Sequence, residues 1–288
     1  MTQQGRFIEQ DIQVNRLIEI VLLAVMFATF ATHISLHVYQ VVANVPPAQR
    51  VPWTTLAPIF SAFAMAHALF MLGWRRALAF FALTAIIAFG FEYIGQSTGA
   101  IFGRYEYTDV LGWKLFTVPV AVLLVYFMVI YPCYVIANLI ISANPISQLH
   151  TMRWILWAAV LTAFVMTAWD LTLDPLMADQ VKAWVWLDGG QYFNVPFQNF
   201  FGWLLTTFAI GSAYRFAETR LPLAPLGRMK KWIVILPVAG FAALSVGDLF
   251  IGYPADTRVI PLFVMGVPVL AALLHFYEPP DRPETTPG

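Results

Sequence analysis

The sequence predicts an all-α membrane protein, a polytopic bundle of about eight transmembrane helices with repeated two-helix hairpins. Composition, apolar stretches and the distribution of basic residues all favour this fold class. Of the 288 residues, 60% are hydrophobic and only 11% are charged, and the mean hydropathy is +0.71. Soluble domains carry about 25% charged residues, so this composition excludes an ordinary soluble protein. The formal net charge of zero gives no sign of a nucleic-acid partner.

Eight stretches of the chain can cross a bilayer, because a spanning helix needs about 20 apolar residues. They lie at roughly 17–40, 54–73, 77–95, 117–141, 152–173, 197–217, 231–250 and 258–277. No linker divides them, so residues 1–278 are predicted to form one transmembrane domain, followed by a disordered Pro- and Thr-rich tail at 279–288. The polar first 16 residues precede an apolar stretch without a cleavage site, which predicts an uncleaved first span rather than a signal peptide.

The basic residues predict the orientation, because they collect on the cytoplasmic side of membrane proteins. Eleven of the 16 fall at the termini and in even-numbered loops: Arg6, Arg16, Arg75, Arg76, Arg153, Arg215, Arg220, Arg228, Lys230, Lys231 and Arg282. The other five fall in odd-numbered loops: Arg50, Arg104, Lys114, Lys182 and Arg258. Both termini are therefore predicted to be cytoplasmic, in a multi-pass protein of the cell membrane.

Two segments of the chain share the same signatures in the same order. An aromatic-x-aromatic-x-Asp motif occurs at 105–109 and again at 184–188, and each is followed by Phe-x-Val-Pro, at 116–119 and 193–196. We therefore predict repeated hairpins of helix, outer loop and helix at about 77–141 and 152–217. A degraded third copy is possible at 231–277. Repeats of this kind commonly place a site at their mutual interface.

Acidic residues close two of the predicted helices. Glu92 lies 17 residues before Asp109, and Asp170 lies 18 residues before Asp188. Asp170 and Asp174 are four apart and share one helical face, and Pro175 is predicted to end that helix. Two carboxylates at such a short separation do not both ionise readily. One of them is therefore expected to hold a proton beside the other, which can accept one. That arrangement suits acid–base chemistry, although a structural role, with Asp174 capping the helix, fits the same spacing.

The remaining candidates are aromatic or polar residues near these acids. Trp and Tyr collect at membrane interfaces in any polytopic protein, but aromatic faces also stabilise cations in a dry pocket. The candidate substrate-binding residues are Tyr105, Tyr107, Trp184, Trp186, Phe193, Asn194 and Asn199. His33 and His37 are expected to form a hydrogen-bonded pair rather than a metal site, and Asp248 to be structural. The single cysteine, Cys133, excludes an internal disulfide and a cysteine metal cluster.

The chain resembles the membrane carotenoid biosynthesis family that includes the CruF-type carotenoid hydratases. The resemblance covers about 85 to 205 and rests on FEYIGQSTG (91–99), GRYEYTDVLG (103–112), AWDLTLDPLM (168–177) and YFNVPFQNFFGW (192–203). It implies addition of water to the terminal carbon–carbon double bond of an acyclic carotenoid, without a redox cofactor. The implied partners are the carotenoid, the lipid bilayer and other enzymes of the pathway. Where family members often have Gly before Val-Pro, this chain has Thr117 and Asn194, which leaves the shape of the substrate open.

Hydration of this kind needs an acid, a shield from premature water and one positioned water. We expect Asp170 or Asp174 to donate the proton, Glu92 to orient the water, and Asp109 and Asp188 to hold the loops closed. The same residues also fit an end-group cyclase, in which an internal double bond captures the cation. A proton-coupled transporter and a lipid-binding membrane protein remain open as well.

Overall fold

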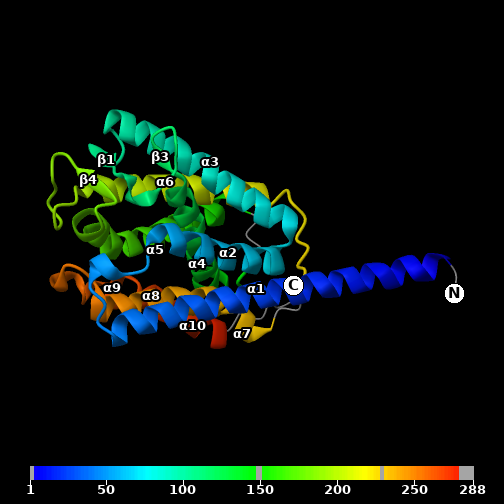
Figure 1. The fold of residues 1–288 in the computed structure, drawn as a ribbon. Coiled ribbons are helices and arrows are strands. Elements are labelled where there is room, and N and C mark those ends of the chain that lie inside the picture. The colour runs from blue at the N-terminus through cyan, green and yellow to red at the C-terminus, as the bar shows by residue number, and fades with distance from the viewer. Residues whose placement is uncertain (1–2, 147–150, 228–229, 279–288) are drawn as a thin grey trace.

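A computed structural model describes residues 3–146, 151–227 and 230–278. Its helices are α1 (Gln3–Val42), α2 (Trp53–Leu72), α3 (Trp74–Thr98), α4 (Val120–Ser142), α5 (Met152–Leu176), α6 (Phe197–Glu218), α7 (Lys231–Val234), α8 (Leu236–Ile251), α9 (Ile260–Val264) and α10 (Gly266–Tyr277). The short strands are β1 (Tyr105–Tyr107), β2 (Lys114–Leu115), β3 (Val118–Pro119) and β4 (Trp184–Trp186). Figure 1 shows the helices as one bundle, with β1 and β4 together at one end and α1 projecting beyond the other. The predicted tail at 279–288 lies outside the described residues.

The all-α membrane bundle predicted from the sequence is confirmed. Within the described residues, six helical segments are long and apolar enough to cross a membrane: Arg16–Val42, Trp53–Leu72, Trp74–Thr98, Val120–Ser142, Met152–Val181 and Ala255–Tyr277. The other two predicted stretches also form helices but do not meet that standard. One is α6, whose last turns carry Arg215 and Glu218, and the other is divided between α7 and the 16-residue α8.

The centre of the bundle is α4, in which every residue from Tyr126 to Leu139 is buried. A helix that is apolar on all sides must be covered on all sides, and α4 packs against α2, α3, α5, α8 and α10. The free cysteine, Cys133, is part of this core. The core therefore surrounds α4, and polar chemistry is placed at the helix ends.

The loops gather alternately at the two ends of the bundle. At the end with the strands, Arg50 Nη2 donates to the Ile251 carbonyl at 2.8 Å, and the Thr108 amide donates to the Ala183 carbonyl at 3.1 Å. At the other end, the Leu226 amide donates to the Phe70 carbonyl at 3.0 Å. Loops that the sequence assigns to one side thus touch one another.

The prediction that Pro175 ends its helix is wrong. Pro175 lies within α5, and the helix continues as a π-helical turn over Met177–Val181. A proline in a helix leaves the carbonyl four residues earlier without its usual donor. Here that carbonyl belongs to Leu171, and it accepts a hydrogen bond of 3.0 Å from the Tyr192 hydroxyl. The loop after α5 therefore supplies the donor that Pro175 lacks.

Candidate active site

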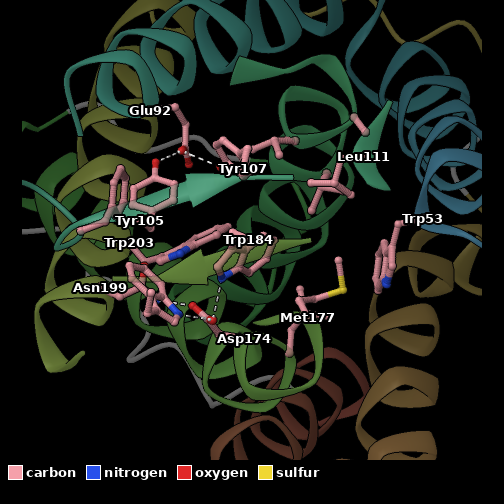
Figure 2. Close-up of a pocket in the computed structure, with 16 residues that line it drawn as sticks. Trp53, Glu92, Tyr105, Tyr107, Leu111, Asp174, Met177, Trp184, Asn199 and Trp203 are labelled. Atoms are coloured by element: carbon pink, nitrogen blue, oxygen red, sulfur yellow. Dashed lines mark hydrogen bonds between the residues drawn. The ribbon is translucent and has the colours of Figure 1, made fainter. Parts of the chain in front are cut away.

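A pocket of about 580 Å³ lies under the two paired strands, among the ends of α3, α4, α5 and α6. We call it the acid pocket. Its lining comprises Trp53, Glu92, Phe102, Tyr105, Tyr107, Leu111, Ala121, Val122, Val125, Leu173, Asp174, Met177, Trp184, Trp186, Asn199 and Trp203. Figure 2 shows Glu92 and Asp174 on opposite sides, with aromatic side chains between them. The pocket is therefore an apolar, aromatic space with a carboxylate on each of two walls.

Glu92 occupies the first wall and is held by three phenols. Its Oε2 accepts hydrogen bonds from the hydroxyls of Tyr105 at 2.6 Å and Tyr107 at 2.7 Å, and its Oε1 accepts one from Tyr126 at 2.9 Å. Burial and then the nearby Glu92 raise the pKa of Tyr105 and of Tyr107, so both phenols keep their protons and act as donors. The Glu92 side chain is 3% exposed, so these three bonds replace its hydration.

Asp174 occupies the opposite wall and is held by indole groups. Its Oδ1 accepts hydrogen bonds from Nε1 of Trp184 at 3.0 Å and of Trp186 at 3.1 Å, and its Oδ2 accepts one from Nδ2 of Asn199 at 2.6 Å. An indole N–H can only donate. Three fixed donors therefore hold this carboxylate at the pocket surface, and none of them competes for a proton.

Asp170 lies one helical turn before Asp174 and outside the pocket lining. Its Oδ2 accepts a hydrogen bond of 3.0 Å from the same Asn199 nitrogen, so one amide group joins both carboxylates. The other oxygen, Oδ1, is buried and has no hydrogen-bond partner among the described residues. A neutral carboxyl tolerates a missing partner better than a buried anion does.

The two strands bring the clusters together. β1 pairs with β4 in antiparallel register, with Tyr105 opposite Trp186 and Tyr107 opposite Trp184. Alternate residues of a strand point to the same side, so both aromatics of each strand face the pocket. The aromatic-x-aromatic spacing in the sequence thus becomes two pairs of hydrogen-bond donors, phenols for Glu92 and indoles for Asp174.

The Phe-x-Val-Pro segments form tight turns before α4 and α6. Leu115 pairs with Val118, and Tyr192 bridges to Val195. The first turn residue has a left-handed backbone in both cases, with φ 53° at Phe116 and 48° at Phe193. These turns position the start of each following helix, which carries Tyr126 in α4 and Asn199 in α6.

Besides Asp170, four of the predicted site residues lie outside the acid pocket. Asp109 is fully exposed and forms an ion pair of 3.0 Å with Lys114. Asp188 pairs with Arg104 at the surface, and this hydrogen bond lowers the pKa of Asp188. Phe193 and Asn194 lie in the exposed turn. The Arg104–Asp188 pair links the loop that carries β1 to the loop that carries β4, whereas the ion pair of Asp109 lies within its own loop.

Sequence reasoning missed several residues that complete the site. Tyr126 donates to Glu92 and also stacks on Trp203, with ring centroids 4.6 Å apart and planes at 13°. Trp53 reaches the acid pocket from the start of α2. The sequence repeat could have indicated Tyr126 and Trp203, because both lie seven residues after the proline of a Phe-x-Val-Pro segment. Trp53 gave no such signal, since only helix packing brings it close.

No metal site is formed in the described part of the chain, where no three His, Cys, Asp or Glu side chains gather closely enough to hold an ion. His33 and His37 contact each other through their rings, with centroids 5.3 Å apart. The hydrogen bond of His33 goes from Nε2 to the Gly240 carbonyl at 3.4 Å rather than to His37. The expected hydrogen-bonded pair is therefore a ring contact.

Comparison with known proteins identifies the family of the chain. The model of the family described as carotenoid biosynthesis protein matches residues 53–269, which include every residue of the acid pocket. The chain belongs to the carotenoid biosynthesis protein family. Over 133 residues, 46% of the chain, it is 32% identical to a protein of Haloarcula japonica named bisanhydrobacterioruberin hydratase. That match spans 42% of the relative's length. No solved structure matches the chain.

Proposed function

We propose that this member of the carotenoid biosynthesis family is a hydratase that adds water to the terminal double bond of an acyclic carotenoid end. The observation that carries the proposal is the acid pocket, with Glu92 and Asp174 on opposite walls of a buried aromatic space. The name of the Haloarcula japonica relative supports the same reaction class. The reaction is that of a carbon–oxygen lyase working in the direction of hydration.

The proton comes from the Asp170–Asp174 pair. Asn199 bridges the two carboxyls, and Asp174 carries three donors while Asp170 has one. A single shared proton relieves the repulsion between two neighbouring carboxylates. Asp174 presents this pair to the pocket and delivers the proton to the less substituted carbon of the double bond.

The aromatic walls stabilise the tertiary carbocation that protonation creates. Tyr105 and Trp186 face each other with ring centroids 5.2 Å apart, and Tyr126 and Trp203 form a stacked wall. A cation within about 6 Å of an aromatic ring gains roughly 0.5–2 kcal/mol. These rings also exclude bulk water, so the cation persists until one positioned water reaches it.

Glu92 completes the reaction from the opposite wall. The attacking water forms the carbon–oxygen bond and loses one proton to Glu92, whose three phenol partners hold the carboxylate in place. The product is a tertiary alcohol. The lining of the acid pocket is largely apolar and aromatic, and we infer that it takes one end group while the rest of the polyene lies outside.

We infer that the protein is a multi-pass protein of the cytoplasmic membrane with both termini in the cytoplasm. The excess of basic residues at the termini and in the even-numbered loops supports this orientation. The acid pocket then lies toward the outer side, under the loops that carry β1 and β4.

The test is expression of the chain in cells that accumulate an acyclic carotenoid, followed by mass analysis of the pigments. The proposal predicts pigments heavier by one water for each processed end. Pigments of unchanged mass and altered absorption would instead mark cyclisation. If the pigments do not change while the protein is present in the membrane, the proposal is wrong.

A further inference from the structure

A second cavity adjoins the acid pocket. We call it the side chamber, and its lining includes His37, Gln40, Arg50, Trp53, Leu173 and Asp248. Trp53 and Leu173 line both cavities. Figure 2 shows Trp53 on the side of the acid pocket away from Asn199. Two side chains therefore form the wall between the side chamber and the acid pocket.

The lining of the side chamber contains several polar side chains. Gln40 is buried, and Nε2 of His37 is buried without a hydrogen-bond partner among the described residues. Asp248 accepts a hydrogen bond of 2.9 Å from Thr172, and Arg50 donates one of 2.8 Å to the Ile251 carbonyl. A buried cavity holds water when it is roomy and offers two to four polar partners, and the side chamber meets both conditions.

A neighbouring cavity provides the contrast. The apolar cavity of about 440 Å³ shares Phe60 and Leu244 with the side chamber, and His33 is the sole ionisable residue in its lining as described. The remaining lining is apolar: aromatic, aliphatic, methionine, proline or glycine, as at Phe63 and Val129. Cavities of that character stay dry. A polar lining is thus not common to the cavities of this bundle, since the apolar cavity lacks one.

We propose that the side chamber stores the water that the hydratase consumes, and that Trp53 and Leu173 meter its passage into the acid pocket. This inference rests on the proposed function. Hydration needs one water molecule at the cation. It fails if bulk water enters the apolar pocket and takes the proton before the double bond does. Water held in the side chamber, behind Trp53 and Leu173, can supply that one molecule while the acid pocket stays free of bulk water. Arg50 is half-buried and lies in the loop between α1 and α2, so the side chamber can refill from the strand-bearing end.

The water from the side chamber adds to the double bond in two steps. The π electrons of the terminal double bond take the proton from the Asp170–Asp174 pair. A lone pair of the water oxygen then forms the carbon–oxygen bond, and the extra proton passes to Glu92. If water arrives late, the cation loses a proton instead and returns the starting alkene. The ratio of these two outcomes therefore reports the water supply.

The first test asks whether the side chamber is wet, without relying on catalysis. In a Cys133→Ala background, Leu56→Cys lines the side chamber and Val129→Cys lines the apolar cavity. A small water-soluble methanethiosulfonate reagent modifies thiolates, which form in water. We expect modification of Leu56→Cys and little modification of Val129→Cys in the folded membrane protein. Equal protection of both cysteines would overturn the proposal.

The second test measures the water supply during turnover in heavy water. Protonation followed by proton loss leaves deuterium in the recovered carotenoid, whereas capture gives the hydrated product. Gln40→Leu removes a polar group of the side chamber, and Gln49→Leu is the same change at an exposed position of the nearby loop. We expect Gln40→Leu to raise deuterium exchange per hydrated product severalfold and Gln49→Leu to leave the ratio unchanged.

An unchanged ratio in Gln40→Leu, with hydration continuing, would overturn the proposal while the hydratase function stands. Absence of hydrated product from the wild-type protein would overturn the hydratase function itself. The cysteine test then still decides whether the side chamber is wet.

Discussion

Asn199 shows at the residue scale how the site depends on shared donors. Its single amide nitrogen lies 3.0 Å from Asp170 and 2.6 Å from Asp174, and both carboxyls are buried. The sequence indicated Asp170 and Asp174 because acids in apolar helices are costly and because these two share a helical face. It could not assign Asn199 to them, since a polar residue early in a span bonds a neighbouring helix in many proteins.

Asp174→Asn tests the donor at this scale. The variant keeps the shape of the side chain and removes an ionisable group from the wall of the acid pocket. General acid–base catalysis contributes about 10²–10⁴-fold, so product formed per folded protein should fall by that order. Asp256→Asn, at an exposed position near the same end of the bundle, is the matched control and should keep wild-type activity. Near-normal turnover of Asp174→Asn would remove this carboxyl from the mechanism.

Tyr126 tests a residue that sequence reasoning missed. Tyr126→Phe keeps the aromatic ring stacked on Trp203 and removes one of the three donors to Glu92. Leaving a buried charged group short of one donor costs about 1–3 kcal/mol. We expect lower turnover, with the carotenoid still bound, and a thermal midpoint shifted downward. Unchanged turnover and midpoint would show that this hydrogen bond has no role.

At the scale of elements, helix packing explains why the ends of α3 and α6 lie so close to the strands. Gly95 in α3 and Gly202 in α6 both border the ring of Phe102, which is 2% exposed and contacts Tyr105 through its own ring. A Cβ at either glycine would overlap the Phe102 ring. The sequence predicted these helices from hydropathy, but it contained no sign that one phenylalanine sits between two glycines, because that contact joins segments far apart in the chain.

Gly202→Ala is therefore expected to lower the stability of the folded protein. Extra volume in a packed core typically costs about 1–3 kcal/mol, and the displaced Phe102 would disturb β1. Gly90→Ala is the matched control, since a Cβ there meets nothing within 4 Å and alanine favours a helix by about 1 kcal/mol. Thermal unfolding in detergent should show a lower midpoint for Gly202→Ala and an equal or higher one for Gly90→Ala. The opposite order would contradict this packing argument.

At the scale of the whole molecule, hydropathy predicted the bundle class and six of the spans, because apolar length is a local property. It did not predict the helix after Pro175, which depends on the Tyr192 hydroxyl from a later loop. The repeat of 77–141 and 152–217 stays a prediction. Its equivalent strands pair with each other, and Tyr126 and Trp203, at equivalent positions, stack. A local two-fold relation between the hairpins would produce both contacts.

The orientation is tested on the same scale. Reporter fusions after Arg220 and at the C-terminus should both read cytoplasmic, because the termini and even-numbered loops hold eleven of the 16 basic residues. A fusion in the loop after β4 should read extracytoplasmic. An extracytoplasmic C-terminus would contradict the orientation and would place the acid pocket toward the cytoplasm.

The central claim is that the acid pocket adds water to a carotenoid end, and its most direct test uses water labelled with heavy oxygen. Membranes that contain the wild-type protein receive an acyclic carotenoid in labelled water, and the pigments are analysed by mass. We expect a product that carries one heavy oxygen for each processed end and that is nearly absent with Asp174→Asn. A modified pigment without heavy oxygen, or equal labelling by wild type and Asp174→Asn, would contradict it.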